Sequence, residues 1–221
     1  LAGLVAGFLL HNPARYAGYL RIPGLEIASA SPETFLQRKG QILRSSPIKG
    51  TRKPGIAGEF PEKDKSENVM IVDLMRNDLG RVCIEDSISV PRLLSTENLP
   101  GIDHLVSDVQ GELRRGLGWG EILAATLPPG SVSGAPKSSA IKLINKYEGI
   151  DRGPYCGAFG WIHGDQADLA VAIRTFWSDG ATVKFGTGAG ITWASDAVSE
   201  WEETELKASR LIAIANGEFA S

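Results

Sequence analysis

Apolar residues recur at helical spacing near both ends of the chain. At the start they stand every three or four positions until Pro13 ends the pattern, which predicts a short amphipathic helix from Leu1, Leu4, Val5, Phe8 and Leu9. A final helix is expected from about Asp196 to Gly217, and its apolar side consists of Trp201, Ala208, Leu211, Ile212 and Ala215. Between these two, Pro61 suits the start and Gly80 the end of another helix.

Two strands are expected early in the chain. Residues 25–30 and 35–45 have the composition of strands, and the second segment contains a turn at residues 38–41. The two segments are joined through Ser31-Pro32-Glu33. This places Glu33 at a turn beside strand ends.

The middle of the chain contains both a strand pattern and helix patterns. Residues 82–90 alternate between apolar and other side chains as in a strand. A polar stretch then leads through His104 to a helix at about residues 119–127, which two prolines end. Pro136 is expected to begin a further helix that ends at Gly149.

Residues 155–185 predict a three-stranded meander with turns at residues 163–165 and at the pair Asp179-Gly180. Arg174 falls in its middle strand, where a covered guanidinium needs a carboxylate partner. That partner comes either from a substrate or from the protein, in a structural ion pair. A glycine-rich loop follows at residues 186–190, and the backbone amides of such a loop can bind an anion.

Composition narrows the function classes. The 221 residues are 43% hydrophobic and 22% charged with a net charge of −3, which is typical of a globular protein and gives no basic surface for nucleic acid. No apolar run is long enough for a membrane span. Cys83 and Cys156 form no CxxC pair, which indicates a reducing, cytoplasmic setting. The chain does not start with Met, and we expect it to be part of a longer protein.

Acidic residues suggest a cation site. On the last helix, Glu200, Glu203 and Lys207 share one edge because they stand three and four positions apart. Taken alone this edge is more simply a solvated face, where Lys207 neutralises the glutamates. Asp64 and Glu67, one turn apart on another helix, favour the cation site, because all these carboxylates together are oxygen donors that suit Mg²⁺. The isolated histidines offer no zinc motif.

Lys49 stands in a constrained segment, residues 47–51. Pro47 restricts its entry and Gly50 allows close approach of the backbone, so the lysine can be held in a cleft. The alternative is a surface lysine in a basic loop with Arg52 and Lys53. A lysine acts as a nucleophile only where its surroundings lower its pKa.

Eight segments, taken together and in order, resemble the chorismate-binding family, and the resemblance covers nearly the whole chain. They are Ser31-Pro32-Glu33, 47–51, 67–79, 104–107, 129–137, Arg174-Thr175, 186–191 and 200–207.

This resemblance implies an α+β fold of two antiparallel sheets packed on one another with helices outside. Residues 1–221 would form one catalytic domain that is partial, lacking its N-terminal portion. The missing portion in relatives includes further strands and a regulatory region.

The lysine in the Pro-Ile-Lys-Gly-Thr segment resembles members of the aminodeoxychorismate synthase type, whereas alanine there is typical of anthranilate, salicylate and isochorismate synthases. The resemblance implies that Lys49 attacks C2 of chorismate while Glu33 protonates the departing C4 hydroxyl. Ammonia then adds at C4 and gives 4-amino-4-deoxychorismate.

Further roles are also implied only by the resemblance. Glu67, Glu200 and Glu203, with Asp64 through water, would hold Mg²⁺. His104 would lie near C4 and the ring carboxylate. The substrate-binding residues would be Thr51, Tyr155, Arg174, Gly188, Ala189, Gly190 and Lys207.

The implied partners are a glutamine amidotransferase, separate or fused, that supplies ammonia, and a downstream aminodeoxychorismate lyase on the route to 4-aminobenzoate and folate. The nearest alternative is anthranilate synthase component I, against which Lys49 argues. An alternative of another class is an inactive subunit that only docks an amidotransferase, but such a protein has no need of the acidic residues.

Overall fold

The computed structural model describes residues 1–56, 58–99, 102–193 and 195–218. The chain forms two compact units, each assembled from separate segments. The first unit contains Leu1–Pro32, Gly149–Gly160 and Ala170–Ser221, and the second contains Glu33–Glu148 and Trp161–Leu169. No described helix is both long and apolar enough to cross a bilayer.

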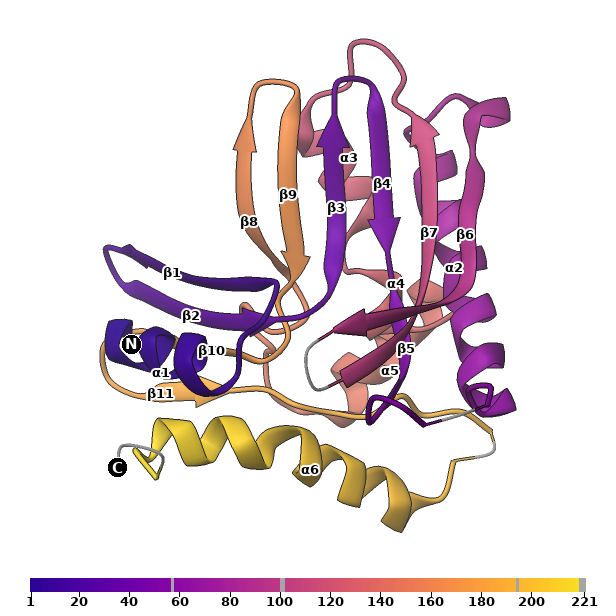
Figure 1. Cartoon of the computed structure of the whole chain (residues 1–221). Coiled ribbons are helices and arrows are strands. Elements are labelled where there is room, and N and C mark those ends of the chain that lie inside the picture. Colours follow the sequence, from indigo (N-terminus) through magenta and orange to yellow (C-terminus); the bar gives the residue numbers. More distant parts are fainter. Residues whose placement is uncertain (57, 100–101, 194, 219–221) are drawn as a thin grey trace. The chain divides into compact units, whose positions relative to one another are not determined.

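The first unit contains a four-stranded sheet and two helices (Figure 1). The strand order is β1-β2-β10-β11, and all neighbours are antiparallel. The strands are β1 (Tyr16–Ile22), β2 (Leu25–Ser31), β10 (Thr175–Ser178) and β11 (Val183–Phe185), and the helices are α1 (Ala2–His11) and α6 (Ala197–Ala215).

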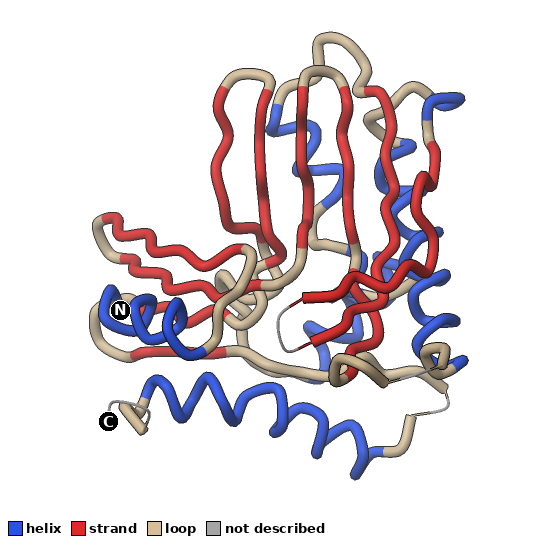
Figure 2. The backbone as a smooth tube through the Cα atoms, in the orientation of Figure 1, coloured by secondary structure: helices blue, strands red, loops and turns tan. Residues whose placement is uncertain are grey.

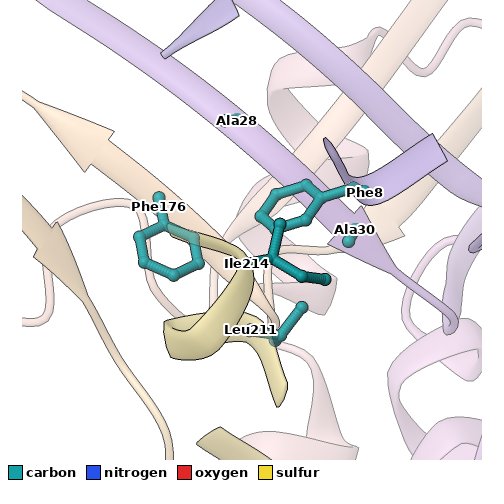
Figure 3. Close-up of a cluster of buried hydrophobic side chains, with 6 residues drawn as sticks. All are labelled: Phe8, Ala28, Ala30, Phe176, Leu211 and Ile214. Atoms are coloured by element: carbon teal, nitrogen blue, oxygen red, sulfur yellow. The ribbon is translucent and has the colours of Figure 1, made fainter. Parts of the chain in front are cut away.

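Helices and sheet of the first unit meet in one apolar cluster (Figure 3). The Phe176 ring lies between two others, 5.8 Å from Phe8 and 4.4 Å from Phe185 between centroids. A Cβ on Gly7 would lie 2.8 Å from Ile214, so glycine lets α1 approach α6 closely. The buried members of the cluster are Phe8, Ala28, Ala30, Phe176, Leu211 and Ile214.

The second sheet has seven strands in the order β5-β7-β4-β3-β9-β8, and β6 also pairs with β7. Helix α2 packs on β5, β6 and β7 (Figure 1). The strands are β3 (Thr34–Lys39), β4 (Ile42–Ser46), β5 (Ile48–Arg52), β6 (Ser89–Leu99), β7 (Ile102–Glu112), β8 (Ala158–His163) and β9 (Gln166–Val171). The helices are α2 (Glu62–Gly80), η1 (Glu85–Ser87), α3 (Trp119–Thr126), α4 (Gly130–Ser133) and α5 (Lys137–Tyr147). Two antiparallel sheets with helices are confirmed.

Most side chains of strand β7 are buried, polar ones included, so the strand does not alternate between buried and exposed residues. Asp108 is only 2% exposed, yet it receives hydrogen bonds from Arg92 Nε at 2.7 Å, from Ser46 Oγ at 2.7 Å and from Arg44. Burial opposes ionisation, but these hydrogen bonds outweigh it and lower the pKa of Asp108. The polar groups of β7 are therefore part of the sheet interior.

Two expectations for the middle of the chain are wrong. Residues 82–90 are not one strand, because Ser87 donates its backbone N–H and its hydroxyl to Ile84 O and closes a 3₁₀ turn before β6 begins. The polar stretch through His104 is instead the long strand β7, paired with β6 (Figure 2). Helices were correctly expected near the start, at 61–80, at 119–127, after Pro136 and at the end.

The three-stranded meander is also wrong. Residues 158–185 form four strands that belong to two different sheets, although both predicted turns are present. Arg174 lies outside any strand, in the link between β9 and β10, and its left-handed φ of +49° directly precedes the first residue of β10. On α6, Trp201 and Ile212 are exposed by 64% and 44%, and Ala215 is exposed too, while Ile214 takes part in the core.

Candidate active site

Lys49 sits on a β-bulge. Ile48 pairs with Val106 and Thr51 with His104, so two residues of β5 oppose one residue of β7 between these pairs. Gly50 has φ of +84°, a conformation that favours glycine. A bulge of this kind redirects the neighbouring side chain. The partly buried Lys49 therefore has a backbone that differs from that of a regular strand.

Asp64 lies directly against this bulge. A Cβ on Gly50 would be 2.9 Å from Asp64 Oδ2 and 3.0 Å from Phe60 Cδ1. Arg52 holds the same segment, because its guanidinium stacks over Phe60 at 4.3 Å and donates to Gly58 O at 2.8 Å. The first turn of α2 thus brings a carboxylate beside the predicted nucleophile's strand.

His104 and Thr51 also meet here. The two residues are opposite one another on β7 and β5, and His104 Nδ1 lies 3.0 Å from Thr51 Oγ1. His104 is 4% exposed. Glu33, the other predicted catalytic residue, is 5% exposed and lies in the link before β3, as expected.

A buried hydrogen-bond network holds α2 on β7, and the sequence analysis missed it. Asn68 is fully buried, donates to Leu105 O at 3.3 Å and accepts from Ser107 Oγ. Ser107 Oγ in turn accepts from the Leu94 N–H at 2.9 Å. Asn68 directly follows Glu67, so this network fixes the helix turn that carries a predicted metal ligand. A polar residue among the apolar positions of a helix was the available signal.

A second polar contact holds the other end of α2. Lys137 Nζ donates to Asp78 Oδ2 at 2.5 Å and to Thr126 O at 3.1 Å. Burial raises the pKa of Asp78, and Lys137 only partly offsets this effect. A Cβ on Gly130 would overlap Leu74 at 2.7 Å. The segment from Gly130 to Lys137 is therefore packed directly on α2.

In the first unit, four of the predicted residues come together. A Cβ on Gly186 would lie 2.5 Å from Tyr155 Cγ, and one on Gly188 would lie 3.2 Å from the Tyr155 hydroxyl. Lys207 Nζ donates to Gly188 O at 3.3 Å and pairs with Glu203 at 2.6 Å. Tyr155, the glycine-rich loop, Lys207 and Glu203 thus form one cluster. The ion pair between Lys207 and Glu203 is the one expected from the sequence if this edge of the helix is a solvated face.

The predicted Mg²⁺ ligands are divided between two helices. Asp64 and Glu67 lie on α2 of the second unit, whereas Glu200 and Glu203 lie on α6 of the first. Glu200 is 5% exposed and accepts a hydrogen bond from Ser195 Oγ at 2.7 Å. Within the residues that the structure describes, no three His, Cys, Asp or Glu gather to hold a metal. All four side chains are carboxylates, the donors that suit Mg²⁺, and the site stays a prediction.

Arg174 and the remaining loop residues complete the predicted set. The Arg174 side chain is partly buried and its carbonyl accepts from Ala30 N–H at 3.0 Å, which fixes the start of β10. Ala189 and Gly190 follow Gly188 in a segment without regular secondary structure. Their roles toward a substrate also stay predictions.

Comparison with known proteins agrees with these motifs. Anthranilate synthase component 1 of Saccharolobus solfataricus is 39% identical over 211 residues, which are 90% of this chain and 50% of that protein. Aminodeoxychorismate synthase component 1 of Bacillus subtilis is 36% identical over 208 residues, 89% of this chain and 44% of that protein. The chain thus spans about half the length of these relatives.

A solved structure shares the fold. Anthranilate synthase component I from Streptococcus pneumoniae superposes with a TM-score of 0.82 at 32% identity, over 94% of this chain and 48% of that one. Residues 4–213 match the family described as chorismate binding enzyme. The chain therefore belongs to the chorismate binding enzyme family.

Proposed function

We propose that the protein is an aminodeoxychorismate synthase, which converts chorismate and ammonia to 4-amino-4-deoxychorismate and water. The observation that carries this proposal is Lys49 on the Gly50 bulge, beside Asp64 and next to the Thr51–His104 pair. A lysine in this segment is the residue type by which the resemblance separates this activity from its relatives. The aminodeoxychorismate synthase of Bacillus subtilis is among the proteins most similar to the chain.

The proposed chemistry is two linked displacements. The neutral Lys49 amine forms a bond to C2 of chorismate, the ring double bonds shift, and the C4–O bond breaks. Buried Glu33 donates the proton that lets the C4 hydroxyl leave as water. Ammonia then adds at C4, its surplus proton returns to Glu33, and the C2–N bond breaks to release Lys49.

The other residues bind and orient the substrate. In this proposal the cluster of Tyr155, the glycine-loop amides and Lys207 receives carboxylates of chorismate, with Arg174 as a further cation. Mg²⁺, which Glu67, Glu200 and Glu203 would hold with Asp64 through water, would supply positive charge to the ring carboxylate. His104 would donate a hydrogen bond near C4, and its contact with Thr51 would hold its ring in place.

The ammonia source is a separate component in this proposal. The relatives named "component 1" support a partner subunit, and we propose that it is a glutamine amidotransferase, separate or fused. A downstream lyase would convert the product to 4-aminobenzoate for folate synthesis in the cytoplasm.

Anthranilate synthase component 1 is the second candidate, because the 39% identical relative from Saccharolobus solfataricus has that name. The two activities differ in product. Anthranilate forms by loss of pyruvate, whereas 4-amino-4-deoxychorismate retains the enolpyruvyl group. A subunit that only docks an amidotransferase would form neither product.

The test is to incubate the full-length protein with chorismate, Mg²⁺ and an ammonium salt, with and without aminodeoxychorismate lyase. We expect 4-aminobenzoate only when the lyase is present, and we expect Lys49→Ala to abolish it. Lys53→Ala is the matched control, because Lys53 is an exposed lysine just beyond β5. Anthranilate from the unmutated protein would assign it to the second candidate, and absence of any product would favour a docking subunit.

A further inference from the structure

Thr51 and His104 face each other across two antiparallel strands. Their side chains meet at 3.0 Å between Thr51 Oγ1 and His104 Nδ1. His104 is buried, whereas Thr51 is an exposed residue near the end of β5. A neutral imidazole has one donor and one acceptor nitrogen, so the partner of Nδ1 decides which role is left to Nε2.

The backbone fixes this pair from both sides. The extra residue at the Lys49–Gly50 bulge shifts the register by one, which brings Thr51 opposite His104. The following pair, Arg52 and Asp103, is held by a contact of 3.7 Å, and Asn98 donates to the same Asp103 at 2.7 Å. The hydroxyl of Thr51 is thus held beside Nδ1 by the strand pairing.

We propose that Thr51 is a positioning residue, which donates its hydroxyl hydrogen to Nδ1 of His104 and holds the imidazole in the Nε2–H tautomer. This inference rests on the proposed function, because an anionic substrate decides between the tautomers. A protonated Nε2 donates a hydrogen bond to a carboxylate or to a departing oxygen, whereas an unprotonated Nε2 can only accept one and so cannot bind a carboxylate. The resemblance implies that Thr51 lies at the substrate, and in the structure its hydroxyl also lies 3.0 Å from His104 Nδ1.

The tautomer can be measured directly. The full-length protein with ¹⁵N-labelled histidine is studied by long-range ¹H–¹⁵N correlation at about pH 8.5, well above the ordinary histidine pKa. His104→Gln assigns the signals. We expect His104 as a single Nε2–H tautomer in the unmutated protein and in Thr51→Ser, and a mixture of tautomers in Thr51→Val. Thr96→Val is the matched control, because Thr96 is an exposed threonine on β6, another strand that pairs with β7.

Kinetics separate positioning from substrate binding. We expect Thr51→Val to lower kcat about tenfold with KM for chorismate changed less than about threefold, and Thr51→Ser to restore kcat. An Nδ1–H tautomer in the unmutated protein, an unchanged tautomer in Thr51→Val, or a raised KM with unchanged kcat would each overturn the inference. If the unmutated protein makes no aminodeoxychorismate, the proposed function fails, and the NMR result alone then decides the role of Thr51.

Discussion

Asn68 of α2 and Ser107 of β7 are hydrogen-bonded inside the protein, far apart in sequence but adjacent in space. Each belongs to a different one of the short motifs by which the chain resembles its family. One motif carries the predicted metal ligand Glu67, and the other begins with His104. The bond therefore ties two segments with proposed chemical roles to each other.

Ser107→Ala is expected to lower the free energy of unfolding by about 2 kcal/mol, because it removes the partner of the buried Asn68 Oδ1 and of the partly buried Leu94 N–H. Urea denaturation of the full-length protein measures the change. Ser95→Ala on neighbouring β6 is the control and should change stability by less than about 0.5 kcal/mol. Equal losses for the two variants would contradict a specific role for Ser107.

Gly50→Ala is expected to destabilise the protein by more than about 1 kcal/mol, because the new methyl group crowds Asp64 and Phe60 at a positive φ. Gly40→Ala is the matched control. Gly40 also has a positive φ of +62°, but a Cβ there meets nothing within 4 Å. Thermal or urea unfolding of both variants separates backbone strain, which the two share, from crowding, which only position 50 has. Equal effects would show that Asp64 and Phe60 move aside at no cost.

Asp108→Asn is expected to lower stability at neutral pH by roughly 3 kcal/mol, because it removes the charge of a buried carboxylate that two partly exposed arginines contact. The pKa of Asp108 is lowered from 3.8 in the folded protein, so the folded state holds fewer protons than the unfolded state in that range. The stabilisation is therefore fully present above the ordinary pKa and is lost as the pH falls through the folded one.

The measurement for Asp108 is urea unfolding of both proteins at a series of pH values. The difference between them should be constant above about pH 5 and should shrink below about pH 4. A difference that stays constant down to acid pH would mean that the Asp108 charge contributes nothing.

Gly186→Ala is expected to displace the Tyr155 ring, because a Cβ would lie 2.5 Å from its Cγ. In the proposed enzyme this raises KM for chorismate about tenfold or more, since the ring lies against the loop that receives carboxylates. Gly3→Ala on α1 is the control, because a Cβ there has open space. If Gly186→Ala leaves both KM and stability unchanged, the ring does not contribute to binding.

The helices could be predicted because the residues that mark them lie close together in the sequence. The apolar spacing at the start and the proline and glycine around α2 each act within a few residues. Strand β7 was not predicted because its polar residues are buried against partners on other segments, as in the contacts of Asp108 with Arg44 and Arg92. No local pattern distinguishes such a strand from a polar loop.

The candidate site could likewise be predicted only in part from the sequence. That Pro47 and Gly50 constrain the Lys49 segment was visible in the sequence, and the structure shows the constraint as a bulge. The Thr51–His104 contact depends on which strands are neighbours and in which register, and this information is not contained in either segment alone. The sequence also could not show that Arg174 belongs to the link that connects a strand of one sheet to a strand of the other, because its neighbours are as apolar as those of a strand.

The bulge at residues 49 and 50 is defined by the strand pairs on either side of it and by the left-handed conformation of Gly50, which does not require a particular side chain at position 49. We therefore expect exchange of the side chain at position 49 to keep the backbone and the neighbouring Thr51–His104 pair. In the proposed enzyme, a change of the one codon for residue 49 would thus alter the chemistry of the site while the backbone that Gly50 defines is kept, so related activities could diverge without rebuilding the scaffold.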